Sequence, residues 1–180
     1  MLLRPLRAGD AAPLFEESAR DPGLWTYLPY GPFEDEAGLR AWLADAERSS
    51  DPLFFAIVPL PGERPTGQAS YLSIEPGAGS IEVGHIWFGP SLRRTPASAE
   101  AILLLAENAF DALGYRRLEW SCNALNAASR RAADRFGFTF EGIARNARVV
   151  KGRNRDTAWY SMTDAEWPAA RERLRGLIAS

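Results

Sequence analysis

Hydrophobic and polar residues follow two different spacings along the chain, and each spacing predicts one kind of element. Short runs rich in β-branched and aromatic residues, separated by proline and glycine turns, are typical of strands. Seven such strands are expected, at residues 2–7, 53–60, 67–75, 80–88, 116–122, 139–150 and 155–163. Pro5 places the first of them at an edge of its sheet, because proline cannot donate a ladder hydrogen bond.

Apolar residues at helical spacing predict five helices among these strands. They are expected at about residues 10–20, 35–48, 96–113, 126–135 and 164–178. Asp10, Thr95 and Asn126 are suited to act as N-caps, and Gly114 and Gly137 follow two of the helices. The order of elements combines an antiparallel meander with strand–helix–strand crossovers. It predicts an α/β fold, with a mixed and mostly antiparallel sheet of about seven strands and helices on both faces.

Length and composition restrict the class of protein. A chain of 180 residues, 46% of them apolar, predicts a single domain, 1–180, that folds without disulfides or metal. Cys122 is the only cysteine and His85 the only histidine, so no zinc cluster or multi-histidine metal site is expected. The opening MLLRPLRAGD is too charged for a signal peptide, and no apolar run approaches the roughly 20 residues of a membrane span. We therefore expect a cytoplasmic protein with no membrane partner.

The net charge of −2 conceals an uneven distribution of charge along the chain. Residues 1–92 carry 6 arginines and 13 acidic residues, whereas residues 93–155 carry 11 arginines, Lys151 and 6 acidic residues. A basic segment inside a nearly neutral chain indicates an anion-binding function.

The start of the basic segment has the features of a phosphate-binding turn. A strand ends at Phe88, Arg93 and Arg94 follow a Gly-Pro-Ser turn, and Thr95 and Pro96 open the next helix. The N-terminus of that helix presents free backbone N–H groups and the positive end of its dipole. Because guanidinium groups also bind phosphate oxygens, we expect an anion site at this junction.

Several short motifs resemble, in their order and spacing, the GNAT superfamily of N-acetyltransferases, and within it the RimJ/RimL-type group. Residues 93–98, Arg-Arg-Thr-Pro-Ala-Ser, correspond to the family's acyl-CoA loop, with Pro96 in place of its first glycine. The other matching segments are Glu-Val-Gly at 82–84, Asn-Ala-Ala-Ser at 126–129, Gly-Phe at 137–138, Glu-Gly at 141–142, Lys-Gly-Arg at 151–153 and Asp-Thr-Ala-Trp-Tyr-Ser at 156–161. The resemblance spans about residues 2–167.

The resemblance implies that acetyl-CoA is the cosubstrate, with no metal, and that the loop and its preceding strand bind it. Backbone groups of Ile86, Trp87 and Phe88 would pair with the pantetheine arm. The residues that would hold the pyrophosphate are Leu92, Arg93, Arg94, Thr95, Pro96, Ala97, Ser98 and Ala99. Asn126 would contact the pantetheine arm, and Ser129 and Arg130 the thiol end or the phosphates. Pro96 weakens the cradle because it lacks an N–H, although it suits the start of a helix.

Acetyl transfer to an amine needs a base for the amine and an acid for the leaving thiolate. Glu82 is the candidate base, acting through water; a structural ion pair is the alternative. The tyrosine that often serves the family as the acid is Ala133 here, so Ser129 is the nearest replacement, unless it is only a helix-start hydroxyl. His85 alternates away from Glu82 along the strand, so we expect a packed side chain there. Cys122 is expected to be buried and structural.

The acceptor is expected to bind beside an aromatic loop at residues 21–33. Trp25, Tyr27 and Tyr30 form either a substrate wall or part of the core, and Tyr160 either lines the acceptor cleft or packs inside. The acidic residues at 34–36 suggest a cleft that favours a cationic amine.

These features predict an acetyl-CoA-dependent N-acetyltransferase whose acceptor is the primary amine of a protein N-terminus, a peptide or a small molecule. One alternative is a cofactor-binding protein of the same fold without catalysis, which Ala133 permits. The other is a nucleic-acid-binding module built on residues 93–155. Nucleic acid is not the expected partner, because the arginines fall on several elements. A homodimer is an expectation drawn from the family.

Overall fold

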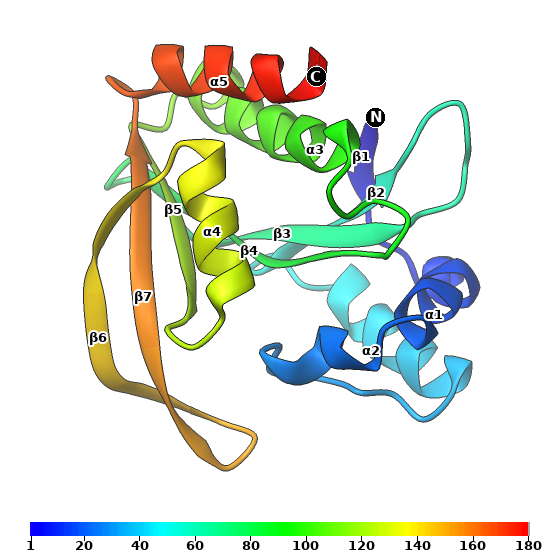
Figure 1. Ribbon diagram of the computed structural model, residues 1–180. Helices are drawn as coiled ribbons and strands as arrows, with labels where there is room; N and C mark the ends of the chain where they lie inside the picture. The colour runs from blue at the N-terminus through cyan, green and yellow to red at the C-terminus, as the bar shows by residue number, and fades with distance from the viewer. Residues whose placement is uncertain (180) are drawn as a thin grey trace.

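The computed structural model describes residues 1–179 and contains one seven-stranded sheet (Figure 1). Its strands lie in the order β1-β2-β3-β4-β5-β7-β6, and every neighbouring pair is antiparallel except β4 and β5. The strands are β1 (Leu2–Pro5), β2 (Leu53–Val58), β3 (Gly67–Glu75), β4 (Ser80–Phe88), β5 (Arg117–Asn123), β6 (Thr139–Val150) and β7 (Arg153–Thr163). The mixed, mostly antiparallel sheet predicted from the sequence is confirmed.

Five α-helices accompany the sheet, in the predicted order. They are α1 (Ala11–Ala19), α2 (Glu36–Glu47), α3 (Pro96–Glu107), α4 (Ala127–Phe136) and α5 (Trp167–Ala179). A π-helical turn, Asn108–Ala112, continues α3, and short 3-10 turns span Ala8–Asp10 and Pro22–Thr26. None of the helices in the described part of the chain is long and apolar enough to cross a membrane.

Two of the three expected N-caps differ from the prediction. Asn126 does cap α4, since its side chain accepts from the backbone N–H of Ser129 at 3.0 Å. Thr95 occupies the cap position of α3 but donates instead to the carbonyl of Leu92 at 2.7 Å. Asp10 makes no cap bond to α1, because its carboxylate accepts from the Arg4 guanidinium at 2.6 and 2.8 Å.

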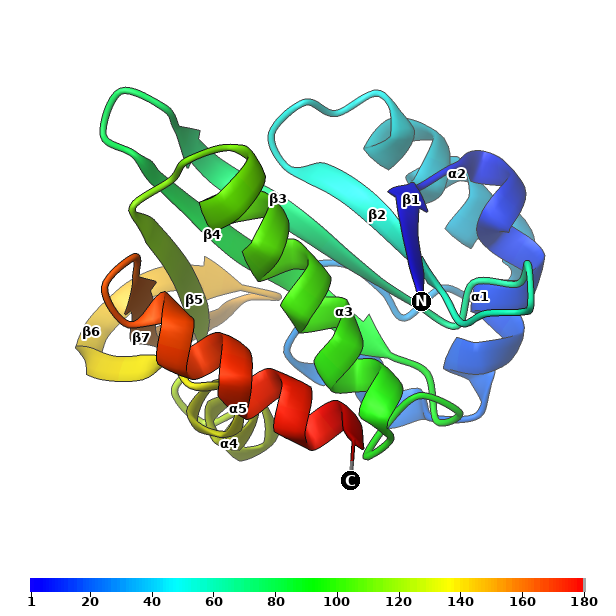
Figure 2. The same cartoon turned by 90° about the horizontal axis from the view of Figure 1, so that it is seen from above.

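Helices cover both faces of the sheet, as predicted, and divide the interior into two cores. One core packs α3, α4 and α5 against β3, β4, β5 and β7, and Figure 2 shows α3 and α5 lying side by side over that face. The second core packs α1 and α2 against the opposite face of β2, with the aromatic loop at its margin. For brevity, these faces are called the α4 face and the α2 face of the sheet.

A bulge in β4 exchanges the two faces halfway along the strand. Val83 lies in the core of the α4 face, whereas Trp87, four residues later, lies in the core of the α2 face. The pairing with β3 shifts between these points, and His85 adopts a φ of +49°. In a regular strand, residues four apart share a face, so the extra residue is the cause of the exchange. His85 consequently shares the α2 face with Glu82, which corrects the expected alternation.

The two central strands separate beyond the bulge. β5 pairs with β4 only from Ser80 to Val83, whereas β3 continues to pair with β4 as far as Phe88. The β4 segment from Gly84 to Phe88 therefore has one backbone edge outside the sheet's hydrogen bonding, facing β5 across a gap.

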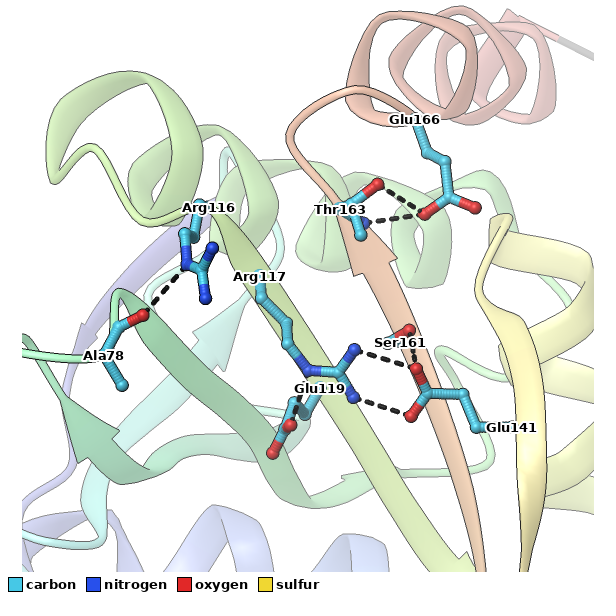
Figure 3. A network of polar contacts seen from close by, with 8 residues as sticks. All are labelled: Ala78, Arg116, Arg117, Glu119, Glu141, Ser161, Thr163 and Glu166. Atoms are coloured by element: carbon cyan, nitrogen blue, oxygen red, sulfur yellow. Dashed lines mark hydrogen bonds and ion pairs between the residues drawn. The ribbon is translucent and has the colours of Figure 1, made fainter.

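An arginine network holds the joined end of β5 against β6 and β7 (Figure 3). The Arg117 guanidinium donates to both carboxylate oxygens of Glu141 at 2.8 and 2.6 Å, and to Glu119 at 2.7 Å. Ser161 on β7 donates to the same Glu141 carboxylate at 2.8 Å. Bidentate bonds of this kind fix geometry, so this end of β5 is held firmly against β6.

Candidate active site

A cleft of about 660 Å³ lies where β4 and β5 separate. Its lining includes residues of α4 from one face of the sheet, among them Ser129 and Arg131. It also includes Glu82, His85 and Tyr27 from the α2 face. Because both faces contribute, the cleft passes between the strands from one side of the sheet to the other.

Glu82 lies at the point where the strands part, and only 2% of its surface is exposed. Its Oε1 accepts from Ser121 Oγ on β5 at 2.6 Å, while Oε2 is buried with no hydrogen-bond partner in residues 1–179. Burial raises the pKa of Glu82 above its ordinary value, and the Ser121 bond partly opposes this shift. The alternative of a structural ion pair is wrong, since Glu82 forms none within the described residues.

His85 faces the same cleft and is neutral at physiological pH. Its ring stacks on Tyr30 at a centroid distance of 5.5 Å and lies 5.2 Å from the Phe54 ring. Burial, assisted by the charges of Arg148 and Arg155, lowers the pKa of His85 to about 4. The expected packing is confirmed, but His85 Nδ1 is buried without a partner in the described chain and lies in the lining of the cleft.

The turn before α3 supplies fewer free amides than expected. The N–H groups of Leu92, Arg93, Thr95 and Ser98 are already bonded to backbone carbonyls of the turn, and Pro96 has none. The side chains of Leu92 and Ala99 are buried in the core, and those of Thr95, Pro96 and Ala97 lie outside the lining of the cleft. Arg94, at a φ of +60°, and Ala97, in the uncapped first turn of α3, retain N–H groups for an anion.

The two arginines of this turn are not equivalent. Both line the cleft, together with Ser98, Ile86, Trp87 and Phe88. Arg93 is engaged, because its guanidinium pairs with Asp21 and donates to the Phe88 carbonyl at 2.9 Å. Arg94 forms no side-chain bond within residues 1–179 and is exposed, so its guanidinium is available to a ligand.

Helix α4 turns a different arginine toward the cleft from the one predicted. Arg130 lies outside the lining, where it donates to Tyr160 Oη at 3.2 Å and covers the Phe140 ring. Arg131 and Arg135 line the cleft instead, four residues apart on one helix face. Their i, i+4 spacing was a signal in the sequence that could have identified this pair. Ser129 and Asn126 do line the cleft, as predicted.

Of the four aromatic residues considered for the acceptor site, Trp25 and Tyr160 take the core alternative, and one of the other two lines the cleft. Trp25 is 4% exposed and packs against Phe33 and Trp87, and Tyr160 is 1% exposed. Tyr30 lies outside the lining of the cleft, with its hydroxyl accepting from Gln68 at 2.7 Å. Tyr27 alone lines the cleft, and its hydroxyl donates to the Leu125 carbonyl at 3.2 Å, so it connects the loop to the start of α4.

The acidic residues at 34–36 do not shape the cleft. Asp35 caps α2 through the N–H of Gly38 at 2.7 Å, Glu36 pairs with Arg40, and neither they nor Glu34 lie in the lining. Two residues that the sequence analysis did not single out lie there instead. Arg148 on β6 and Arg155 on β7 face each other across the hairpin and both line the cleft.

Cys122 and Ala133 are buried, as expected for a structural thiol and a core position. Burial raises the pKa of Cys122, opposed first by a hydrogen bond from Ser129. The methyl group of Ala133 packs in the core and does not line the cleft. Among residues 1–179, no group of three or more histidine, cysteine or acidic side chains is arranged to hold a metal.

The arrangement suits acyl transfer to an amine. A carboxylate with a raised pKa and a free oxygen lies at the midpoint of a cleft that crosses the sheet. An unpaired strand edge runs away from this carboxylate, and three arginines that have no partner within residues 1–179, Arg94, Arg131 and Arg135, line the same cleft. A long anionic ligand fits along that edge, and a second ligand fits on the α2 face.

Comparison with known proteins points to one family. A model of the acetyltransferase (GNAT) domain matches residues 1–139. A GCN5-related N-acetyltransferase from Brucella melitensis is 45% identical, with a TM-score of 0.92 over 97% of this chain and 80% of its own. A GNAT-family protein from Chromobacterium violaceum is 47% identical, with a TM-score of 0.87 over 92% and 84%.

RimJ of Mycobacterium smegmatis, solved with CoA-disulfide, is 25% identical, with a TM-score of 0.81 over 97% of this chain and 87% of its own. A search of curated proteins gave no match. The predicted resemblance is confirmed, and the chain belongs to the GNAT acetyltransferase family.

Proposed function

We propose that this protein transfers an acetyl group from acetyl-CoA to the nitrogen of a primary amine. The observation that carries the proposal is the unpaired edge of β4 from Gly84 to Phe88, which ends beside the free Oε2 of Glu82. RimJ, whose structure contains CoA-disulfide, shares the fold over nearly the whole chain and supports acetyl-CoA as the cosubstrate.

The chain's own groups fit the parts of acetyl-CoA. The backbone of Ile86, Trp87 and Phe88 is not paired by β5, so an extended amide-bearing arm can pair with it on that side as a further strand would; the Phe88 carbonyl there already accepts from Arg93. The guanidinium groups of Arg94, Arg131 and Arg135 and the amides of Arg94 and Ala97 are the donors available to its phosphates. Asn126 lines the same cleft; its Oδ1 caps α4, and its side-chain NH2 donates to no group within residues 1–179.

In the chemical step, bound acetyl-CoA supplies the acyl carbon, and CoA leaves as its thiolate. Glu82 takes the proton that the amine loses, directly or through water, onto the Oε2 that no other group occupies. Because its pKa is raised toward the pH of the solution, the Glu82 carboxylate is a stronger base than an ordinary one, which favours proton transfer at neutral pH. Neutral His85 beside it adds no charge that would repel a protonated amine.

Ser129 is the proposed donor to the leaving thiolate. Its hydroxyl accepts from Trp120 Nε1 at 3.0 Å, so its own proton stays available for the cleft. With alanine at 133, no tyrosine competes for the role.

Calorimetry and a CoA-release assay test the proposal together. We expect saturable binding of acetyl-CoA, and release of CoA when amino acids, N-terminal peptides or small amines are added. Absence of acetyl-CoA binding would overturn the proposal outright. Binding without acetylation of any amine would favour the second candidate, a cofactor-binding protein without catalysis, which the missing tyrosine at Ala133 supports. A homodimer and a cytoplasmic location stay predictions of the sequence.

A further inference from the structure

Two arginines on the β6–β7 hairpin line the cleft without a bonded partner in the described residues, and the acidic residue whose charge acts on them is Glu82. Arg148 and Arg155 are direct cross-strand partners, and both line the cleft. Within residues 1–179, neither side chain forms a hydrogen bond or an ion pair, and Arg155 Nε is buried without a partner. Burial and the charge of Arg148 lower the pKa of Arg155, so this guanidinium is partly desolvated and repelled by its exposed cross-strand neighbour.

The same sheet shows how a structural arginine is satisfied. Arg117 on β5 is bonded to two carboxylates through three of its nitrogens (Figure 3). Like charges opposite one another on paired strands are destabilising, and buried polar atoms without partners cost stability. Two facing arginines that bond to no carboxylate are therefore unfavourable for the fold alone, and their positions in the cleft indicate an anionic ligand.

The arginine pair lies on the acceptor side of the sheet. Along β7, Ala158, Tyr160 and Met162 face the α4 core, so Arg155, an odd number of residues from each, lies on the α2 face with Glu82. The charges of both arginines act on His85, and that of Arg155 also on Glu82. The arginines assigned above to the phosphates of acetyl-CoA, Arg131 and Arg135, lie on α4, on the opposite face.

We propose that the acceptor is an amine that carries a carboxylate a few bonds from its nitrogen, and that Arg148 and Arg155 bind this carboxylate. The inference rests on the proposed acetyltransferase function and names its substrate class. Two guanidinium forks match the planar carboxylate, while the amine of the same molecule points toward Glu82. Polyamines are poor acceptors on this basis, because the pair repels a second cationic group.

The carboxylate has two sources, with the same chemistry in the site. It is the α-carboxylate of a free amino acid, or the side-chain carboxylate of an acidic residue at a peptide N-terminus. Two matched pairs of acceptors separate them: alanine against alaninamide, and the dipeptide amide Asp-Ala against Asn-Ala. Spermidine serves as an amine without a carboxylate.

The experiment measures CoA release with each acceptor, and calorimetric binding of the same acceptors to the CoA-saturated protein. We expect the carboxylate member of at least one pair to have a KM and a Kd roughly 10- to 100-fold lower than its amide. Arg155→Gln and Arg148→Gln should remove that preference and leave the KM for acetyl-CoA unchanged. Arg155→Lys keeps the charge but loses the two-pronged guanidinium, so it should retain part of the preference for the carboxylate acceptor.

Arg153→Gln is the matched control. It removes the same charge from the same hairpin, but Arg153 lies outside the lining of the cleft. It should leave the carboxylate preference intact. Thermal unfolding of each variant checks that the hairpin still forms.

Equal use and equal binding of carboxylates, amides and spermidine would overturn the inference while leaving acetyl transfer itself in place. A carboxylate preference that survives in both Gln variants would overturn the assignment of the arginines. Failure of the protein to bind acetyl-CoA would instead overturn the proposed function, and the inference with it.

Discussion

The two halves of β4 belong to one continuous strand but have different roles. From Ser80 to Val83 the strand is paired on both sides, by β3 and by β5. From Gly84 to Phe88 it is paired with β3 alone and borders the cleft on its open side. The first half holds the carboxyl of Glu82, and the second half provides the backbone edge.

One inserted residue separates these roles. The bulge changes the face of every later side chain and turns His85 toward the side of Glu82. The comparison shows that a one-residue bulge is enough to divide a continuous strand into a structural half and a half that is open to a ligand. The predictions below test whether chemistry belongs to the first half and cofactor binding to the second.

The largest effect is expected from Glu82→Gln in the paired half. Gln keeps the acceptor for Ser121 but cannot take a proton, so kcat should fall by roughly 100- to 10,000-fold. The acidic limb of the wild-type pH profile should lie above the ordinary carboxyl range, since burial raises the pKa of Glu82. Steady-state kinetics and calorimetry check this, and an unchanged kcat, or a large loss of acetyl-CoA affinity, would contradict the division of roles.

Gly67→Ala should displace only the half of β4 from Gly84 to Phe88, which β5 does not pair. A Cβ at Gly67 would lie 2.6 Å from the Trp87 carbonyl oxygen and 3.3 Å from Phe88 Cα, so β4 must move. We expect a loss of about 1–3 kcal/mol in stability and roughly tenfold weaker acetyl-CoA binding, because strain displaces the open edge. Chemical denaturation and calorimetry measure the two effects.

The control for this variant is Gly77→Ala, in the turn between β3 and β4, where a Cβ meets nothing within 4 Å. It should bind acetyl-CoA like the wild type. Equal affinity in both variants would show that the position of the β4 edge does not matter for the cofactor.

A smaller effect on acetyl-CoA affinity should distinguish Arg131 from its neighbour Arg130 on α4. Arg131→Gln should weaken acetyl-CoA binding about 3- to 10-fold, and more at low salt, because Arg131 lines the cleft and is open to solvent. Arg130→Gln removes the same charge, but the contacts it loses are with Tyr160, Phe140 and the Ala124 carbonyl, outside the cleft, so its affinity should match the wild type. Calorimetry at two salt concentrations decides between them, and the reverse order would contradict the orientation of α4.

The smallest effect concerns acid stability. The pKa of His85 falls from 6.5 to about 4 on folding, so the unfolded chain binds the proton more tightly in this range. The associated stability is fully present above about pH 6.5 and is lost as the pH falls toward 4, by about 1–2 kcal/mol for a partly exposed ring. His85→Gln should lose less stability over the same interval, as urea denaturation at the two ends would show; an identical loss would mean that His85 is not the group responsible.

Most of the fold could be predicted from the sequence, because strand and helix periodicities are local. The boundaries of β3 and β4 agree with their apolar runs, and Gly137 ends α4 at a φ of +95°, as its position implied. The bulge could not be predicted, since the β4 segment is continuous and the extra residue appears only in its pairing with β3. The prediction that His85 faces away from Glu82 is wrong because it assumed a regular strand without this bulge.

The site was less predictable, because a side chain's direction depends on tertiary packing. On a helix one residue changes the direction by about 100°, so Arg130 and Arg131 are equivalent in a motif but lie on different sides of α4. The aromatic loop offered no periodicity to distinguish Tyr27 from the buried Trp25. The hairpin arginines did carry a signal: Arg148 and Arg155 are equally distant from the centre of the turn at 151–152, which makes them cross-strand neighbours.

Lys151, at the tip of that turn, donates to the Trp25 carbonyl at 2.8 Å and so ties the hairpin to the aromatic loop. It is also the only lysine of the chain. An amine-reactive reagent therefore meets one side-chain amine in the whole sequence, at the point where two walls of the cleft touch. The rate at which that amine is modified would report how often the walls part, and a ligand that holds them together would slow it.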